Sequence, residues 1–421
     1  MNYSIDTTNN QEVPQGYKET KVGVIPEEWE VVKVGELCDC IVPGRNKPSN
    51  FIGTIPWVTT PDLTDKYISD TKNKLYIDNN EAKKIGSKIV VKDSVIMTCV
   101  GEFGIISIVN NDIVINQQLH AFLPSQLIES EFLYYALHTQ IKYMDRIATK
   151  TAVPYMNKNN CNSIPIPLPP LKEQQKIAKI LTTWDDAISK QEKLIKEKEQ
   201  LKKGLMQKLL SGEVRFDGFR DEWENVKLGD IINILSSKRV LQKDWQDKGI
   251  PFYRTREIVN LSNGDKFRAP IFISNKLFES IKNKYGVPKT GDILVTGVGT
   301  IGETYIVKEN DKFYFKDGNV LWFQIKDNII SKYLSYLFKT RSIKKQLSDN
   351  ASITTVATFT IEGAKQTIIT FPSIEEQQKI AQVLSTADKE IELLKNELES
   401  LKEQKKGLMQ RLLSGEVRVK I

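Results

Sequence analysis

A long internal repeat limits the folds open to this chain more than any other feature of its sequence. The segment GLMQKLLSGEVRF begins at Gly204 and GLMQRLLSGEVRV begins at Gly407, so the two copies lie 203 residues apart. The segments KEQQKIAKIL, from Lys172, and EEQQKIAQVL, from Glu375, repeat at the same offset. This period is far longer than the roughly 20–45 residues of a solenoid repeat. The sequence therefore predicts two copies of a whole domain, each followed by a helix.

The repeat continues upstream with an offset that changes gradually. EEWEVVKVGE, from Glu27, matches DEWENVKLGD, from Asp221, and DSVIMTCVGEFG, from Asp93, matches GDILVTGVGTIG, from Gly291. These offsets of 194 and 198 residues are shorter than 203, which indicates small insertions in the second copy. The 421-residue chain is thus a tandem duplication of a unit of roughly 200 residues.

Each copy combines a mixed globule with a long helix. Runs of β-branched residues broken by glycine, such as KTGDILVTGVG, predict strands, and apolar residues at i, i+3 and i+4 in IESEFLYYALHTQIKYMDRIA predict helices. Prolines precede both expected long helices, and proline can open a helix but not continue one, so we expect the helices to begin there. Gly212 and Gly415 are expected to end them. We expect an α+β fold with an N-terminal segment at 1–25, globules at 26–163 and 219–370, a central region at 164–218 with a helix at about 171–211, and a C-terminal helix and tail at 371–421.

Apolar residues at alternating spacings of four and three run along both expected long helices. A stripe of this length predicts a coiled coil, because an unpaired helix would expose a large apolar face to water. Two matched stripes in one chain can bury each other, although Gln191, Lys198 and Lys202 interrupt the first stripe and Lys405 the second. The predicted helix-pairing residues are Ile177, Leu181, Trp184, Ile188, Ile195, Leu205, Leu209, Ile380, Leu384, Ile391, Leu394, Leu398, Leu401, Leu408 and Leu412.

The motifs that would indicate an enzyme are missing from the sequence. Residues 297–302 fit GxGxxG but lie between two expected strands, so no helix N-terminus is available there for a pyrophosphate. The sequence has no GxxxxGK[ST] loop and no NPPY or DPPY motif, and its carboxylates show no convincing metal-binding spacing. We therefore expect no catalytic residue and no metal in this chain, and we interpret 297–302 as the turn of a hairpin.

Cysteine spacing, apolar run length and net charge restrict the class of protein further. The cysteines form no CxxC pair, so we expect reduced, buried thiols rather than a structural zinc site. No run of about 18 apolar residues could span a membrane, and the polar start MNYSIDTTNN predicts a cytoplasmic protein. The net charge of +7 suits a partner rich in phosphate. The four cysteines are Cys38, Cys40, Cys99 and Cys161.

Three segments resemble the specificity subunit of type I restriction–modification systems: GYKETKVGVIPEEWEVVKVGEL at 16–37, IPIPLPPLKEQQKIAKIL at 164–181 and PSIEEQQKIAQVL at 372–384, together with the paired GLMQ(K/R)LLSGEVR segments. The resemblance implies that the globules are target-recognition domains, each reading one half of a bipartite asymmetric site in double-stranded DNA. It also implies that the helices pair antiparallel as a spacer, which docks two methyltransferase (modification) subunits, and that two restriction subunits join them. S-adenosylmethionine, ATP and Mg²⁺ would then belong to those partners and not to this chain.

Candidate DNA-binding residues come first from positions where the two copies share a scaffold but differ in chemistry. IPWVTTPDL and IPFYRTREI align without a gap, so Thr59 aligns with Arg254 and Pro61 aligns with Arg256. Arginine can bind guanine O6 and N7 together, and period-two spacing would put both arginines on one face of a strand. A solvated strand face or salt bridges would explain the same arginines.

Basic loops and polar segments supply the other candidates. The loops VPGRNKPSN and SSKRV are expected to contact phosphates, and Gln117, Gln118 and His120 are expected to read adenine edges, with polar contacts at the edge of the core as the alternative. The candidate DNA-binding residues are Arg45, Lys47, Thr59, Thr60, Gln117, Gln118, Lys150, Thr151, Tyr155, Lys238, Arg239, Tyr253, Arg254, Arg256, Lys316, Asn319, Thr354 and Thr355.

Two other classes of protein compete with a DNA reader. A coiled-coil scaffold could join two protein partners without touching DNA, but the basic loops favour DNA. An enzyme of unrecognised type, such as a nuclease, would need a metal-binding carboxylate cluster of the kind that we do not find in the sequence.

Overall fold

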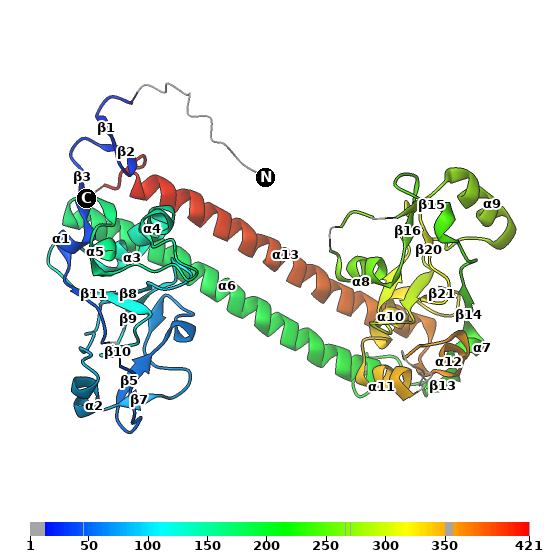
Figure 1. Cartoon of the computed structure of the whole chain (residues 1–421). Helices are drawn as coiled ribbons and strands as arrows, with labels where there is room; N and C mark the ends of the chain where they lie inside the picture. Colours follow the sequence, from blue (N-terminus) through cyan, green and yellow to red (C-terminus); the bar gives the residue numbers. More distant parts are fainter. Residues whose placement is uncertain (1–12, 45, 266, 270, 350–356, 421) are drawn as a thin grey trace. The chain divides into compact units, whose positions relative to one another are not determined.

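The computed structural model describes residues 13–44, 46–265, 267–269, 271–349 and 357–420 (Figure 1). The chain forms two compact units, which are Met1–Glu192 with Asn396–Ile421, and Lys193–Lys395. The boundary falls inside both long helices, so the end of the second repeat packs with the first globule rather than with its own. In the part of the chain that the structure describes, no helix is long and apolar enough to cross a bilayer.

The first unit is built around a five-stranded sheet in the order β4-β11-β8-β9-β6, with a smaller sheet β10-β5-β7, a hairpin β1-β2 and a pair β12-β3. Its strands are β1 (Tyr17–Thr20), β2 (Gly23–Pro26), β3 (Glu30–Lys33), β4 (Cys40–Ile41), β5 (Ile55–Val58), β6 (Tyr67–Ile68), β7 (Tyr76–Ile77), β8 (Val95–Thr98), β9 (Ile106–Val109), β10 (Val114–Ile115), β11 (Leu119–Phe122) and β12 (Pro165–Leu168). Its helices are α1 (Val34–Leu37), the 3₁₀ turn η1 (Thr60–Asp62), α2 (Asn79–Lys84), α3 (Ser130–Thr139), α4 (Ile141–Ile147), α5 (Lys158–Asn162) and the first part of α6 (Leu171–Ser211).

The central strands of this sheet are buried on both faces. β8 and β9 have no exposed position, because successive side chains alternate between two separate cores. Val95 and Met97 join the core that contains α3 and α6, whereas Ile96 joins the core that contains Val58 and Leu63. This explains why the sequence shows continuous β-branched runs here rather than an alternation of apolar and polar residues.

The second unit repeats this arrangement. Its sheet β14-β21-β18-β19 corresponds to β4-β11-β8-β9, and its pair β13-β22 corresponds to β3-β12. The strands are β13 (Glu224–Lys227), β14 (Asn233–Ser236), β15 (Trp245–Gln246), β16 (Ile250–Tyr253), β17 (Phe272–Ile273), β18 (Ile293–Thr296), β19 (Thr304–Ile306), β20 (Tyr314–Phe315), β21 (Val320–Gln324) and β22 (Ile368–Phe371). The helices are α7 (Leu228–Ile231), η2 (Gln242–Asp244), α8 (Thr255–Asn263), α9 (Asn275–Tyr285), α10 (Ser331–Leu337), α11 (Arg341–Asp349), α12 (Ile361–Gln366) and α13 (Ile374–Leu413), whose last part belongs to the first unit.

Several local predictions agree with the structure. β18 and β19 pair antiparallel on either side of 297–302, so the GxGxxG segment is a hairpin turn and not a nucleotide loop. Gly212 follows α6 with φ 74°, and Gly415 follows α13 with φ 71°. This left-handed conformation ends a helix and is readily adopted by glycine. The α+β class and the internal duplication are confirmed.

The two long helices pair antiparallel within the first unit (Figure 1). An ion pair joins Glu192 of α6 to Lys402 of α13 at 2.9 Å, and another joins Asp185 to Lys405. Glu192 comes after Asp185 in α6, whereas its partner Lys402 comes before Lys405 in α13, so the two helices run antiparallel. The helix-pairing residues predicted from the sequence are all buried or half-buried along α6 and α13.

The second unit has its own antiparallel segment of the same two helices. Here Glu199 of α6 pairs with Lys395 of α13 at 2.6 Å, and Lys202 pairs with Asp388. At the end of the segment, Leu209 joins a core that also contains Ile380 and Leu384 of α13 and residues of the globule. The ends of the apolar stripes therefore anchor the globule as well as the partner helix.

Candidate nucleic-acid interface

Several predicted DNA-binding residues of the first globule line one surface pocket. Lys47, Thr59, Gln117 and Gln118 border a pocket of about 280 Å³, together with Trp57. These residues come from three separate segments of the sequence. The parallel pairing of β10 with β5 brings the segments together, because the turn after β10 then lies beside the turn after β5.

Hydrogen bonds orient the Gln118 carboxamide in this pocket. Thr60 Oγ1 donates to Gln118 Oε1 at 3.3 Å, and Asn116 Nδ2 donates to the same oxygen at 3.2 Å. Both lone pairs of Oε1 are then occupied, which leaves the amide nitrogen as the group that can donate to DNA. Gln118 therefore suits a single bond to an acceptor on a base edge, such as the N7 of adenine, rather than a two-bond pairing. Gln117 is exposed and keeps that option.

Thr59 has a structural task that its sequence context did not reveal. Its backbone N–H and its hydroxyl both donate to Asp62 Oδ2 at 2.7 Å. Asp62 is 3% exposed, so these bonds satisfy a buried carboxylate and cap the 3₁₀ turn η1.

The predicted placement of Arg254 and Arg256 on one strand face is wrong. β16 ends at Tyr253, Arg254 is the N-cap of α8, and Arg256 lies inside that helix. Both guanidinium groups pair with Glu257: Arg254 through Nε and Nη2 at 3.2 Å each, and Arg256 through Nε at 3.3 Å. Period-two spacing puts residues on one face only within a strand, and α8 already begins at Thr255, between the two arginines.

Glu257 explains why an arginine stands at position 254. This carboxylate is 1% exposed, and burial disfavours its charged form, yet the hydrogen bonds from Arg254 outweigh burial and lower the pKa of Glu257 below its ordinary value. Asp62 is the aligned residue of the first copy, where a threonine satisfies it. Thr59 and Arg254 therefore differ in type because each one bonds the buried carboxylate of its own globule, Asp62 or Glu257.

Arg256 keeps more freedom to contact DNA than Arg254. The Arg256 side chain is 72% exposed, whereas that of Arg254 is 33% exposed. Arg256 uses only Nε in its hydrogen bond to Glu257, so its two terminal nitrogens can still form the paired bonds that recognise guanine.

The other candidates of the second globule, Tyr253, Lys316 and Asn319, are half-buried. The Tyr253 ring stacks on Phe313 with 5.1 Å between centroids, so it is half-buried in an aromatic cluster. The backbone N–H of Lys316 donates to the carbonyl of Tyr253 at 2.8 Å, and the carbonyl of Asn319 accepts from Gly297 at 2.8 Å. The side chains of Lys316 and Asn319 are half-buried.

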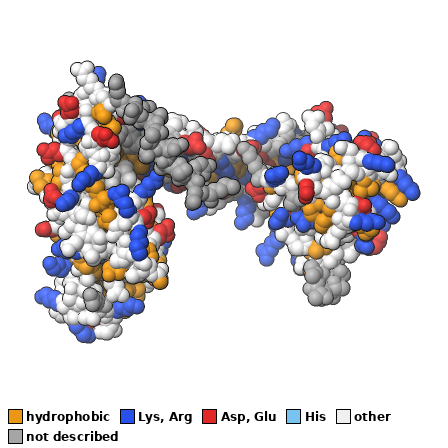
Figure 2. All heavy atoms as spheres, turned by 45° about the horizontal axis from the view of Figure 1, so that its top comes forward, with side chains coloured by type: hydrophobic (Ala, Val, Ile, Leu, Met, Phe, Trp, Pro, Cys, Tyr) orange, Lys and Arg blue, Asp and Glu red, His pale blue; other side chains and the backbone are white. Residues whose placement is uncertain are grey.

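The basic loops present exposed cations in both units. Lys47 and Lys238 are exposed, and Lys238 Nζ lies 5.3 Å from the centroid of the Tyr285 ring. Arg239 is 74% exposed but pairs with Asp317 at 2.8 Å, which neutralises part of its charge locally. In the view of Figure 2, Lys and Arg side chains are scattered among neutral ones on each globule rather than gathered in one block.

The segment 149–157 carries three exposed candidates, Lys150, Thr151 and Tyr155. An isolated bridge between Val100 and Tyr155 attaches this segment to the turn after β8. The segment is thus held at the surface of the five-stranded sheet, with its polar side chains exposed.

Four candidates have other outcomes. Arg45, Thr354 and Thr355 lie outside the described residues. His120 is 4% exposed, and its Nδ1 lies 3.1 Å from Cys161 Sγ, so the prediction that it reads an adenine edge is wrong.

The structure also identifies a function for the repeated GEVR segment that the sequence did not reveal. In the first unit, Arg418 donates from Nε and Nη2 to the Glu173 carboxylate at 2.8 and 2.9 Å, and Trp29 Nε1 donates to it at 3.2 Å. Glu173 is fully buried. We call these three residues the Glu173 cluster; it joins the end of α13 to the start of α6.

The second unit contains the equivalent Glu376 cluster. Arg215 donates from Nε and Nη2 to Glu376 at 2.8 and 2.7 Å, and Trp223 Nε1 donates to it at 3.0 Å. The end of α6 is thereby fixed to the start of α13. The equal 203-residue offsets of the two glutamates and the two arginines were the available signal, but sequence could not say which of them meet.

The glutamine that follows each of these glutamates ties the helix to its globule. Gln174 accepts from the backbone N–H of Glu129 at 2.9 Å and donates to the carbonyl of Pro169 at 2.9 Å. Gln377 makes the two equivalent bonds in the second unit. The repeated EQQ segment therefore attaches each long helix to its globule through hydrogen bonds.

Two similar globules with polar and basic loops, each joined to an antiparallel helix pair, define a duplicated recognition protein. The model of the family "Type I restriction modification DNA specificity domain" matches residues 26–200 and 220–403. The chain belongs to this family, and its function is DNA sequence recognition in a type I restriction–modification system. A scaffold without DNA contact is not favoured.

Known relatives agree along nearly the whole chain. The type I restriction enzyme MjaVIII specificity subunit of Methanocaldococcus jannaschii is 27% identical over 96% of this chain and 97% of its own length. The type I system S subunit from M. genitalium has a similar fold, with a TM-score of 0.55 and 16% identity over 92% of this chain and 96% of that one. A chain from a study of complex assembly and conformational transition of the type I system gives a TM-score of 0.59 with 16% identity, over 93% and 99%.

Proposed function

We propose that each globule reads one half of a bipartite, asymmetric DNA site. One observation carries this proposal: the two copies keep the same turn after β5 and β16, but equip it with different polar groups. The first copy has Pro61 where the second has Arg256, whose side chain is 72% exposed. Two related surfaces with different donors suit two different half-sites.

The base contacts that we assign follow from exposure and from free hydrogen-bonding groups. In the first globule, Gln117 and Gln118 would donate to bases from the pocket, while Lys47 beside them would contact a phosphate. In the second globule, Arg256 would pair with guanine. Arg254 would act through Glu257 and not through a base.

Methyl transfer and cleavage would be performed by partner subunits. Specificity subunits do not catalyse these reactions, and we assign S-adenosylmethionine, ATP and Mg²⁺ to two methyltransferase and two restriction subunits. The antiparallel helix segments would dock the methyltransferase subunits, because related residues of the two copies present similar surfaces. The purified chain alone is expected to show neither methyl transfer nor DNA cleavage.

Methylome sequencing tests the proposal directly. The chain is expressed with its methyltransferase subunit in a host without other methylation, and the methylated motif is read for the wild type, Gln118→Ala and Arg256→Ala. We expect a bipartite asymmetric motif, with Gln118→Ala relaxing one half and Arg256→Ala relaxing the other. A symmetric motif, or one variant relaxing both halves, would contradict the assignment.

A further inference from the structure

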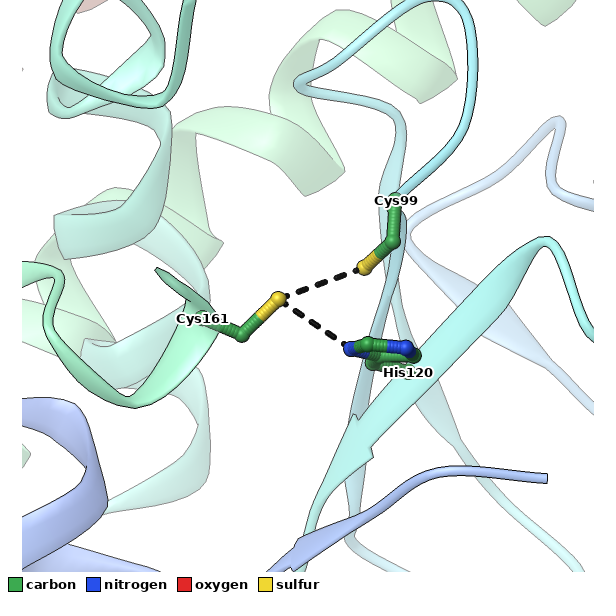
Figure 3. A group of neighbouring side chains, drawn as sticks. All are labelled: Cys99, His120 and Cys161. Carbon is green, nitrogen blue, oxygen red and sulfur yellow. Dashed lines mark hydrogen bonds between the residues drawn. The ribbon is translucent and has the colours of Figure 1, made fainter. Parts of the chain in front are cut away.

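Three soft ligand groups converge inside the first globule, although they are far apart in the sequence (Figure 3). Cys99 follows β8, His120 lies on β11, and Cys161 lies on α5. Cys161 Sγ is 3.6 Å from Cys99 Sγ and 3.1 Å from His120 Nδ1, and the three ligand atoms all lie within 4.8 Å of one another. Each residue is buried, with at most 4% of its surface exposed.

These separations are close to those of a tetrahedral zinc site. With Zn–S bonds of about 2.3 Å and Zn–N bonds of about 2.0 Å, tetrahedral geometry puts donor atoms roughly 3.5–3.8 Å apart. The two separations from Cys161 Sγ, 3.6 and 3.1 Å, lie within about half an ångström of these values. Two thiolates would balance the charge of Zn²⁺, so the buried site would carry no net charge. Hard cations such as Mg²⁺ and Ca²⁺ prefer oxygen ligands and do not suit this set.

The second globule shows that the fold does not require these side chains. Its aligned residues are Gly297, Leu321 and Ala364, and it keeps the same backbone bridge, here between Val298 and Thr358. A hydrogen-bonded thiol and imidazole packed in a core would explain the distances, but not why three donors converge only in the first copy. The convergence is therefore a property of the first copy's chemistry and not of the shared architecture.

We propose that the first globule binds one Zn²⁺ through Cys99 Sγ, His120 Nδ1 and Cys161 Sγ. The fourth ligand is a water molecule or Cys40, whose position opposite Phe122 places its side chain on the same face of the sheet as His120. The ion is structural, because the site is closed to solvent and lies in the interior of the globule.

The site also has a consequence for recognition, which rests on the proposed function. Zn²⁺ would join the end of β8 to α5, and the segment 149–157, which directly precedes α5, carries the exposed candidates Lys150 and Tyr155. Because α5 directly follows this segment and Tyr155 is bridged to Val100 in the turn after β8, fixing α5 and that turn would fix the surface that the segment offers to the first half-site. The second half-site would be unaffected, because its globule lacks the ligands.

Metal content of the full-length chain tests the site without reference to DNA. The wild type, purified from zinc-supplemented cells, is expected to contain about one zinc per chain by mass spectrometry. Cys161→Ser and His120→Leu are expected to reduce zinc to background. Cys38→Ser is the matched control, since Cys38 is also a buried free thiol but lies outside the cluster. Replacing zinc by Co²⁺ should give sulfur-to-cobalt charge-transfer absorption in the wild type and in Cys38→Ser only.

A variant with the residues of the second copy separates loss of metal from loss of fold. Cys99→Gly, His120→Leu and Cys161→Ala together should leave a folded chain by circular dichroism that contains no zinc. A zinc-free wild type that does not respond to Co²⁺ would overturn the proposal, as would a Cys99–Cys161 disulfide or equal zinc loss in Cys38→Ser. If zinc is present but the methylated motif is not bipartite, the metal site stands and the proposed function fails.

Discussion

The two copies of the repeat have the same helix sequence pattern but opposite charges where the helices meet. Glu192 and Glu199 of the first copy align with Lys395 and Lys402 of the second. In the structure Glu192 pairs with Lys402 in the first unit, and Glu199 pairs with Lys395 in the second. Two identical first copies would instead bring Glu192 against Glu199, and two identical second copies would bring Lys395 against Lys402.

Other contacts in the same helices do not distinguish the copies. Asp185 pairs with Lys405, and the aligned Asp388 pairs with Lys202, so either copy could pair with itself through these residues. The contacts between α6 and α13 are therefore of two kinds. Some would also form between two identical helices, and others favour the pairing of α6 with α13. These ion pairs are about half exposed, so each contributes only about 0.2–1 kcal/mol, and they bias pairing rather than enforce it.

The largest expected effect comes from breaking the Glu376 cluster. Arg215→Ala leaves a carboxylate that is 1% exposed without its guanidinium, which we expect to destabilise the second unit strongly. Arg418→Ala should likewise destabilise the first unit, because Glu173 is 0% exposed and loses the guanidinium that pairs with it. Hydrogen exchange of peptides from each unit measures the two effects separately.

Arg411→Ala is the matched control for this pair of variants. Arg411 forms an exposed ion pair with Glu416 in the same repeated segment, so its loss should change stability by less than about 1 kcal/mol. Equal exchange in both units after Arg215→Ala would show that the two clusters are not independent.

Arg254→Ala and Arg256→Ala should separate stability from DNA reading. Arg254→Ala is expected to destabilise the second unit by about 2 kcal/mol, because Glu257 loses its main partner. Arg256→Ala should leave stability nearly unchanged and cost about 1–3 kcal/mol of discrimination at one base pair of the second half-site. Thermal unfolding and the methylated motif are the two measurements. An unchanged motif in Arg256→Ala would remove this residue from the interface.

The lowered pKa of Glu257 predicts how this unit responds to acid. A carboxyl group whose pKa is lower in the folded state stabilises the fold above its unfolded pKa, near 4.5. That stabilisation is lost as pH falls through the folded pKa, so the loss begins below about pH 4.5. In Glu257→Gln this part of the pH dependence should disappear from the unfolding midpoint, whereas Asp265→Asn, an exposed control, should retain it.

The charge comparison makes a weaker prediction about a half-length fragment. Residues 1–218 contain one globule and one helix, and two such fragments should pair through their helices with two-fold symmetry, at about micromolar concentration. Glu199→Lys converts two repulsive contacts of that dimer into attractive ones, which should tighten it by about 1–2 kcal/mol. Sedimentation measures the association. Glu197→Lys, the same change at a residue whose ion pair in the described part of the chain is with Lys193 of its own helix, should have a smaller effect.

The smallest expected effect is that of a single phosphate contact. Lys47→Ala should weaken binding to all DNA sequences alike and reduce the salt dependence of binding by about one unit of slope. Arg239→Ala should have less effect, because Asp317 already neutralises part of its charge. Affinity measured over a range of salt concentrations distinguishes these variants from base readers, which change specificity.

The sequence by itself determined the duplication, the helix ends at Gly212 and Gly415, the apolar stripes and the family. These features are encoded in local patterns, such as spacing along a helix or an αL residue at its end, and the repeat shows each pattern twice. A local pattern needs no knowledge of distant neighbours, so it can be read before the fold is known.

Only the tertiary structure decided which groups meet. The sequence predicted Arg254 and His120 as base-reading residues, but Arg254 bonds the buried Glu257 and His120 lies beside Cys161. Arg215 reaches Glu376 across 161 residues of chain. A side chain's type fixes the bonds that it can make, but its partners depend on how the backbone closes, and that closure is a sum over many weak contacts that no single segment encodes.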